Sequence, residues 1–432
     1  MSYTFIDIFA GAGGLSEGFV RQGFVPIAHV EMDPYASQTL KTRMTYHHLK
    51  KEGRLTEYRR YLTGEISQEE FYKCLPSQQD EVILNREISD STIDDIFKEI
   101  DGTLLRKTGQ SEKVDILIGG PPCQAYSLVG RARDPYGKEK DPRNHLYKQY
   151  VKFLQKYNPE IFIFENVPGI LNAAGGTLFK DVENILREVG YEIKAETLNA
   201  ASFGVLQQRR RVILIGWKKE LQHSYPKFDN VTHNYTVNDL LIDLPPLLPV
   251  TDKLSDSKYR SGPTSYLEKY GIREENDILT QHITRVHNEN DIKIYRIAIQ
   301  LWEEKKQRLK YTDLPEELKT HKNVHAFLDR FKVVGANLQH SHTMVAHIAK
   351  DGHYYIHPFK EQNRSLSVRE AARIQSFPDN FYFEGPRTAV FTQIGNAVPP
   401  IMAERIAEKV LKMLKNEIEI EVGTDEGQQV LF

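Results

Sequence analysis

Residues 114–127 read Val-Asp-Ile-Leu-Ile-Gly-Gly-Pro-Pro-Cys-Gln-Ala-Tyr-Ser, an apolar run followed directly by two glycines, two prolines and a cysteine. The run 114–118 is typical of a buried strand, and such a strand ends at the carboxyl edge of a sheet, where open α/β folds place their sites. Prolines stiffen the backbone, and glycines let a ligand approach it closely. A cysteine that only fills a core would have aliphatic neighbours, so this setting favours a reactive thiol at Cys123.

The composition is that of an ordinary globular protein. The chain has 432 residues, of which 40% are hydrophobic and 27% charged, and its formal net charge is -2. This length allows one large domain plus a smaller one. Cys74 and Cys123 are the only cysteines, which excludes a disulfide scaffold and suits the reducing cytoplasm, where we expect the protein to work. No apolar run approaches the roughly 18 residues of a membrane span, and we expect no signal peptide and no membrane partner.

Strand-like runs alternate with helical stretches. This alternation predicts an α/β fold with a mostly parallel sheet covered on both faces. Asp33-Pro34 predicts the start of a helix, and residues 44–82, rich in charged residues and tyrosine, predict a helical insertion. A helix over 290–310 would place its apolar side chains on one face, most simply a core face. The strand-like runs are 4–9, 25–31, 114–118, 161–164 and 211–215.

The composition changes again near residue 218, where prolines and a polar stretch interrupt the α/β pattern. The α/β character returns in the last quarter of the chain, before an acidic tail. We therefore expect a domain formed by 1–217 and 336–416, a smaller domain at 218–335 and a tail at 417–432.

Polar side chains follow several of these strands. The loop 9–15 does not fit the G-x-G-x-x-G fingerprint of dinucleotide sites, but its glycines suit a nucleoside cofactor without a pyrophosphate. Glu31 ends the strand 25–31, where a carboxylate can accept hydrogen bonds from ribose hydroxyls. Glu165 ends another apolar run and is interpreted as either a proton donor or a helix cap or ion-pair partner. Arg209 and Arg211 alternate along a strand, so they share one face.

Together these motifs resemble the C5-cytosine DNA methyltransferases of prokaryotic type, nearly from end to end. The most specific matches are Pro-Pro-Cys-Gln, Glu-Asn-Val with Gln-x-Arg-x-Arg, and Gln-Ile-Gly-Asn-Ala-Val-Pro-Pro at 393–400. The resemblance implies a Rossmann-like class I methyltransferase domain, with residues 218–335 as a target-recognition domain. The matching motifs occur in the family's order at 7–19, 31–33, 119–127, 164–167, 207–212, 364–381 and 393–400.

The resemblance also implies the chemistry. Cys123 would attack C6 of a flipped-out cytosine as a thiolate, and Glu165 would interact with N3. Arg209 and Arg211 would hold the base O2 and orient Glu165. C5 would then take a methyl group from S-adenosylmethionine, leaving S-adenosylhomocysteine, and no metal is required.

The cofactor contacts come from three strand ends and the C-terminal motif. The family's third contact is an Asp-Ile pair, whereas this chain has Glu87-Ile88, with Asp90 as an alternative. The implied cofactor residues are Phe9, Gly11, Gly13, Glu31, Met32, Glu87, Ile88, Leu146, Asn396 and Val398. The implied DNA-binding residues are Gln124, Ser127, Arg131 and Arg133.

The implied partners are double-stranded DNA and a cognate restriction endonuclease, with the enzyme acting as a monomer. One alternative is a tRNA cytosine methyltransferase, against which the long 218–335 segment argues. A regulatory relative without catalysis is a second, but this chain keeps Cys123, Glu165 and Arg211. An unrelated protein that binds S-adenosylmethionine is a third, and it would not explain Pro-Pro-Cys-Gln.

Overall fold

The computed structural model describes residues 2–77, 82–109, 113–122, 146–249 and 258–417. In these residues seven strands form one sheet in the order β3-β2-β1-β4-β5-β7-β6. The first five pair in parallel, and β7 is antiparallel to both β5 and β6, so the predicted mostly parallel α/β sheet is confirmed. The strands are β1 (Thr4–Ile8), β2 (Val25–Glu31), β3 (Ile83–Asn85), β4 (Ile116–Gly119), β5 (Ile161–Asn166), β6 (Tyr191–Asn199) and β7 (Arg210–Lys218).

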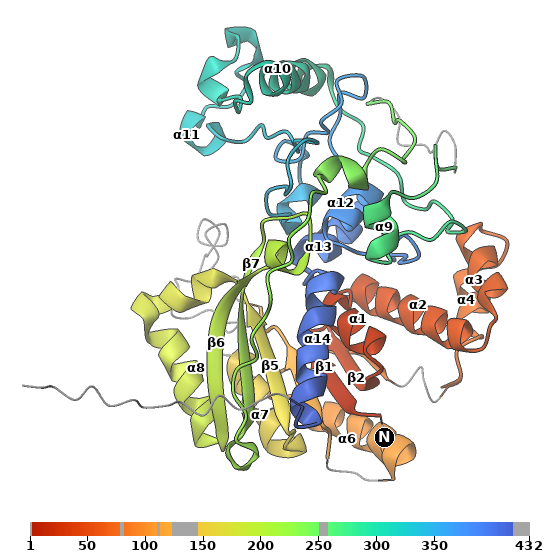
Figure 1. Cartoon of the computed structure of the whole chain (residues 1–432), viewed down its shortest axis with the longest axis vertical. Helices are drawn as coiled ribbons and strands as arrows, with labels where there is room; N and C mark the ends of the chain where they lie inside the picture. The colour runs from red at the N-terminus through yellow and green to blue at the C-terminus, as the bar shows by residue number, and fades with distance from the viewer. Residues whose placement is uncertain (1, 78–81, 110–112, 123–145, 250–257, 418–432) are drawn as a thin grey trace, which may run out of the picture.

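Two hydrophobic cores lie on the two faces of the sheet, because successive side chains of a strand point to opposite faces. On one face Phe5 and Ile116 pack with α1 (Gly14–Arg21) and α14 (Pro400–Leu414). On the other, Ile6 and Leu117 pack with three helices, which are labelled in Figure 1. These are α6 (Ile93–Thr108), α7 (Leu146–Tyr157) and α8 (Thr177–Glu188).

The insertion expected at 44–82 is helical where it is described, although its first helix starts earlier. α2 (Pro34–Lys51) begins at the predicted cap, where Asp33 accepts a hydrogen bond from the Ala36 N–H at 2.9 Å. It is followed by α3 (Leu55–Leu62) and α4 (Gln68–Tyr72), and the three helices share a small aromatic core in which Tyr61 stacks on Phe71.

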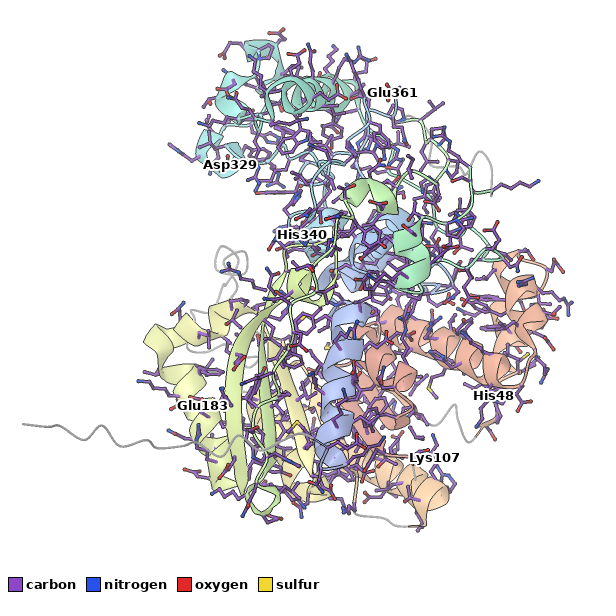
Figure 2. All side chains as sticks on the ribbon, in the orientation of Figure 1. His48, Lys107, Glu183, Asp329, His340 and Glu361 are labelled. Atoms are coloured by element: carbon purple, nitrogen blue, oxygen red, sulfur yellow. The ribbon has the colours of Figure 1, made fainter. Side chains whose placement is uncertain are left out.

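A second lobe is built around α10 (Glu289–Lys305) and α11 (Val324–Phe327), at the top of Figure 1. Tyr295, Ala298 and Ile299 are buried in its core, as the helical spacing predicts. In Figure 2, Asp329 lies in this lobe, whereas Glu183 and Lys107 lie on the sheet domain.

The lobe's own core does not start at residue 218, where the composition changes. Tyr225, Leu240 and Tyr266 belong to the same core as the sheet residues. The separate small core begins only at Ile294. The segment between 218 and 289 therefore covers the sheet domain and leads into the lobe. Its short helices are η5 (Lys219–Leu221), η6 (Val237–Leu240) and α9 (Ser265–Lys269).

Buried charges attach this segment to the returning C-terminal part of the chain. Arg373 of α12 (Val368–Ile374) donates to Asp243 at 2.5 Å and to Asp379 at 2.6 Å, and all three side chains are fully buried. Arg364 binds Glu370 in the same region at 2.7 Å.

The remaining elements are η3 (Pro168–Gly176), η4 (Ala200–Phe203), η7 (Tyr311–Asp313), η8 (Glu316–Leu318), η9 (Ala346–Ala349) and α13 (Arg387–Asn396). Among the helices described here, none has the length and apolar character needed to cross a membrane.

Candidate active site

Glu165 and Arg211 form an ion pair at the carboxyl edge of the sheet. Glu165 lies on β5 and faces Ile213 of the antiparallel β7, so the strand register brings Arg211 beside it. Arg211 Nε lies 2.7 Å from Glu165 Oε1, and the two side chains are 9% and 14% exposed. Burial lowers the pKa of Arg211, and the Glu165 carboxylate opposes that shift. A paired carboxylate that retains some exposure can reach a ligand at the sheet edge.

The two glycines after β4 make room for this carboxylate. A Cβ atom on Gly120 would lie 2.5 Å from Glu165 Oε2, and one on Gly119 would lie 2.3 Å from the Ile8 carbonyl oxygen. Both distances are shorter than any ordinary contact. The sequence suggested that these glycines admit a ligand. In the structure, the groups that approach them closely are protein atoms, one of which is the candidate catalytic carboxylate.

Asn166 holds the chain that leads to Cys123. Its Nδ2 donates to the Pro121 carbonyl at 3.0 Å, and its side chain is buried. The sequence analysis quoted Asn166 within Glu-Asn-Val but gave it no role. Cys123, Gln124, Ser127, Arg131 and Arg133 lie outside the residues that the structure describes.

Arg209 does not share the position of Arg211. Its guanidinium is fully buried and donates to the carbonyl oxygens of Met344, Gly395 and Asn396. Burial and the nearby Arg211 both lower the pKa of Arg209. β7 begins at Arg210, so Arg209 precedes the strand on which the alternation was expected. Its contacts place it as a support for the backbone around Asn396, one of the expected cofactor residues.

Gln207 makes a second set of links across the same region. Its Nε2 donates to the Ile374 carbonyl at 2.9 Å, and its Oε1 accepts from the Met344 N–H at 2.8 Å. Gln207 thereby joins the start of β7 to α12 and to the loop before η9. This role was not foreseen, although the residue belongs to the Gln-x-Arg-x-Arg motif.

The expected ribose carboxylate, Glu31, is held in a fixed position. Its Oε2 accepts from the Gly11 N–H and its Oε1 from the Asp33 N–H, both at 2.8 Å. Burial raises the pKa of Glu31, and these backbone N–H groups oppose the shift. Gly11 has a φ of 55°, and a Cβ there would have no atom within 4 Å, so the loop leaves open space beside the carboxylate.

The first loop and the C-terminal motif meet directly. A Cβ on Gly14 would lie 2.3 Å from the Val398 carbonyl oxygen, and one on Gly13 would lie 2.7 Å from the Leu40 side chain. Val398 is buried, whereas Asn396 at the end of α13 is exposed. The structure thus brings the first loop against the C-terminal motif that carries Asn396 and Val398.

The two residues of the third expected cofactor contact, Glu87 and Ile88, differ in burial. Ile88 is 4% exposed and packs in the core, whereas Glu87 is exposed. The alternative, Asp90, accepts hydrogen bonds from two residues of α7, Gln149 and Lys152, so this carboxylate already has partners.

The remaining cofactor candidates lie after β1, after β2 and at the start of α7. Met32, which follows β2, is 63% exposed. Phe9 has a φ of 58° and is half-buried, as is Leu146 at the start of α7. Asn85 was not foreseen, and its Nδ2 donates to the carbonyl oxygens of Glu31 and Met32 at 2.9 and 3.1 Å. Asn85 thus fixes the backbone turn that carries Glu31 and Met32. The only signal for it in the sequence is its place at the end of a short strand.

Comparison with known proteins identifies relatives of the whole chain. The sequence model for the family described as C-5 cytosine-specific DNA methylase matches residues 3–70 and 86–412. The chain is 42% identical to the type II methyltransferase M.Bpa9945I of Bacillus paralicheniformis over 439 residues, covering 94% of this chain and 98% of that protein. It is 29% identical to the type II methyltransferase M1.HphI of Haemophilus parahaemolyticus, over 96% of this chain and 89% of that protein.

A solved structure from E. coli shares the fold. It is described as a DNA modification methyltransferase encoded within a prophage, and it is 23% identical to this chain with a TM-score of 0.61. The match covers 96% of this chain and 100% of that one. The α/β fold derived above is therefore one already seen in a DNA methyltransferase.

Proposed function

Because the chain belongs to the C-5 cytosine-specific DNA methylase family and is a DNA cytosine-5-methyltransferase, we propose that it acts on a specific duplex sequence through a covalent bond between Cys123 and the base. The observation that carries this proposal is the Glu165–Arg211 ion pair, which lies at the carboxyl edge of the sheet beside Gly120. Cys123 follows Gly120 by only three residues in the sequence, which supports a site that uses both its thiol and this carboxylate.

Cys123, Glu165 and Arg211 account for activation of the base. The Cys123 thiolate forms a bond to C6, and the electron pair of the C5–C6 double bond is delocalised onto C5 and the ring. Glu165 in its protonated form donates its proton towards N3, where negative charge would otherwise accumulate, and Arg211 holds the carboxyl group in position. After C5 has been methylated, a base takes the C5 proton, the C–H electron pair restores the C5–C6 double bond, and the bond from C6 to the thiolate breaks. Because C6 is inaccessible within a duplex, the cytosine must first leave the stack.

S-adenosylmethionine supplies the methyl group as an electrophilic sulfonium. The residues near Glu31 fit its nucleoside part, because the carboxylate is held by two backbone N–H groups and faces the open space at Gly11. Asn396 and Val398 close the same region from the C-terminal motif. Arg209 supports Asn396 through its backbone, so we assign it to positioning rather than to contact with the base.

Residues 218–335 serve as the target-recognition region, in which the lobe built on α10 projects away from the sheet domain (Figure 1). Side chains that contact base edges would set the sequence, while Arg131 and Arg133 would bind phosphates and Gln124 and Ser127 the flipped nucleotide. The type II relatives support a role in restriction and modification with a cognate endonuclease. We place the enzyme, as a monomer, in the prokaryotic cytoplasm because its substrate is there.

The covalent step can be tested by mechanism-based trapping. Bisulfite sequencing of DNA from cells that express the chain first identifies the target. Duplex DNA carrying 5-fluorocytosine at that position should then trap the wild type, because fluorine cannot be lost as a proton is. Cys123→Ala should neither be trapped nor transfer methyl groups. The matched control Cys74→Ala should be trapped by this DNA and should transfer methyl groups to unmodified DNA. Undiminished turnover by Cys123→Ala would overturn the proposal.

A further inference from the structure

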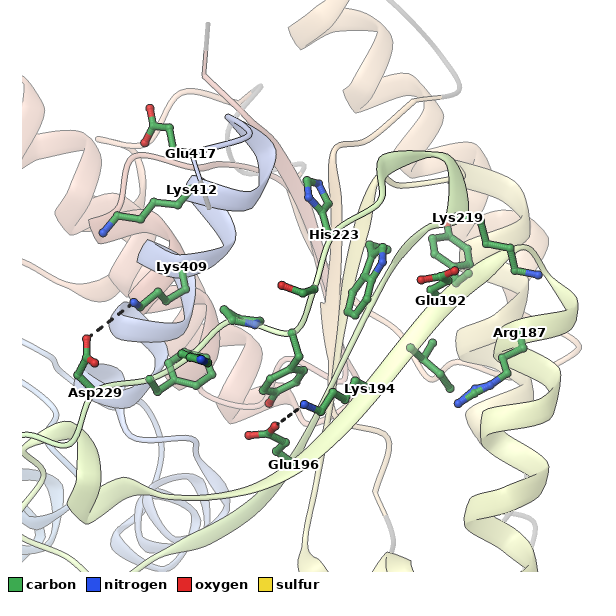
Figure 3. A pocket seen from close by; sticks show the side chains of 18 residues that line it. Arg187, Glu192, Lys194, Glu196, Lys219, His223, Asp229, Lys409, Lys412 and Glu417 are labelled. Atoms are coloured by element: carbon green, nitrogen blue, oxygen red, sulfur yellow. Dashed lines mark ion pairs between the residues drawn. The ribbon is translucent and has the colours of Figure 1, made fainter. Parts of the chain in front are cut away.

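A groove lies far from the candidate active site, at the other end of β5 and β7. Glu165 faces Ile213 in the sheet register, whereas Trp217, which lines the groove, faces Ile161 at the start of β5. The groove has a volume of about 1450 Å³ and lies between α14 and the edge strand β6 (Figure 3). Neither the catalytic proposal nor the recognition lobe uses it.

Aromatic side chains line the groove beside the strands. Trp217 and Tyr225 are 5% and 7% exposed, and Phe228 packs partly buried against the same core. Trp217 Nε1 is buried and has no hydrogen-bond partner among the residues that the structure describes. A buried indole N–H normally finds a partner, so a backbone carbonyl in the groove would satisfy it.

Lysines lie on both sides of these rings. Lys409 and Lys412 extend from α14 on one side, and Lys194 and Lys219 lie on the other (Figure 3). Lys194 is 59% exposed and pairs with Glu196 at 3.0 Å, while Lys409 approaches Asp229 only to 4.0 Å. Lys412 pairs with Glu408 at 3.0 Å, and the carboxylates of Glu192, Glu196 and Asp229 also line the groove. Surface pairs of this kind contribute little, so the ammonium groups remain able to bind further carboxylates.

The chain itself enters this groove. Glu417 lines it, and its N–H donates to the Lys412 carbonyl at 2.8 Å. The sequence continues Ile-Glu-Ile-Glu-Val over residues 418–422, and residues 418–432 contain four acidic residues and no lysine or arginine. In an extended segment, alternate side chains point to opposite sides. Apolar side chains would then face the aromatic rings, and the glutamates would face the rim.

We propose that residues 418–422 bind in this groove of the same chain. Ile418, Ile420 and Val422 pack against Trp217, Tyr225 and Phe228, and Glu419 and Glu421 pair with the groove lysines. Five extended residues span about 16 Å, and they follow directly on Glu417, which already lines the groove. The segment would cover the surface next to β6, which forms one edge of the sheet and pairs with β7 alone among the described strands. Such an edge can pair with another chain.

Zero-length carbodiimide cross-linking of the full-length wild type tests the proposal. Glu419 and Glu421 should couple to Lys194 and Lys219, which are distant in sequence, at least about ten-fold more than to the exposed Lys51, because the tether raises the local concentration. Mixing ¹⁴N- and ¹⁵N-labelled protein identifies links between copies. Links spread over the surface, links between copies, or no links to Lys194 and Lys219 would each overturn the proposal.

The two tryptophans of the chain allow a second measurement. In a Trp302→Phe background, Trp217 reports on the groove alone. Ile418→Ser with Ile420→Ser should raise acrylamide quenching of Trp217 by about two-fold as the segment leaves, while Val430→Ser with Leu431→Ser serves as the control. Methyl transfer should be unchanged, so this outcome is independent of the catalytic proposal. Equal quenching in both variants would contradict the inference.

Discussion

Replacing Gly120 by alanine would insert a methyl group into the space beside the candidate catalytic carboxylate. The added Cβ would lie 2.5 Å from Glu165 Oε2, so the carboxylate must move by about 0.9 Å to reach the 3.4 Å of ordinary contact. The Glu165 carbonyl oxygen, at 3.1 Å, must also shift slightly. Because the carboxylate is the flexible end of a side chain, the protein can accommodate this change and still fold.

The expected effect is therefore on rate and not on folding. A displacement of about 1 Å at a catalytic group can cost about 10²-fold in rate. The free energy of unfolding should change by less than about 1 kcal/mol, since rotamer strain and the loss of glycine's freedom in the unfolded chain oppose each other. Binding of S-adenosylmethionine should stay as in the wild type, because Gly120 does not belong to its expected contacts.

Single-turnover methyl transfer to duplex DNA containing the target would measure this rate, and thermal unfolding would measure stability. Gly102→Ala is a matched control within α6, where the new Cβ would meet only the end of the Arg106 side chain at 3.3 Å. It should raise the free energy of unfolding by about 0.5–1 kcal/mol and leave the rate unchanged. A Gly120→Ala enzyme that is folded and within three-fold of wild type would refute the reasoning from steric contact.

Three further outcomes follow from the described contacts. Arg211→Gln should slow methyl transfer by about 10²-fold or more, since Glu165 loses its partner, whereas the exposed neighbour Arg210→Gln should have little effect in the same assay. Glu31→Ala should weaken S-adenosylmethionine binding by about ten-fold or more in calorimetry, and unchanged affinity would exclude Glu31 from the site. Burial would raise the pKa of Glu370, but Arg364 holds it well below its usual range. This pair therefore stabilises the fold above about pH 4–5, and its contribution is lost as the pH falls further. The unfolding temperature should accordingly fall less between pH 7 and pH 3 for Glu370→Gln than for wild type.

The positions of β1, β2, β4 and β5 and several local features could be predicted from sequence because their causes are local. An apolar run followed by glycine predicts β4, and Asp33-Pro34 predicts the start of α2. The two edge strands β3 and β6 were not predicted. The first residues of β6 alternate between buried and exposed, but the signal of a half-exposed edge strand is weak.

The division of roles between Arg209 and Arg211 could not be predicted in this way. Both arginines occupy the same phase of a period-two pattern, so periodicity cannot separate them. What separates them is the position of Met344 and Asn396, more than a hundred residues away in sequence. The role of Gly120 is similar, because the need for glycine comes from Glu165 on the neighbouring strand. Such contacts depend on the tertiary fold.

The buried ion pairs of Arg373 have a consequence for building enzymes of new specificity from this scaffold. Exchanging the whole of 218–335 for a relative's segment would remove Asp243 and leave Arg373 with an altered buried environment. Breaking a buried pair typically costs about 3–5 kcal/mol, a large part of a domain's stability. A graft limited to 289–333 would keep Asp243 and replace most of the lobe's separate core. Chimaeras joined at these inner positions should therefore fold more readily than those joined where the composition of the sequence changes.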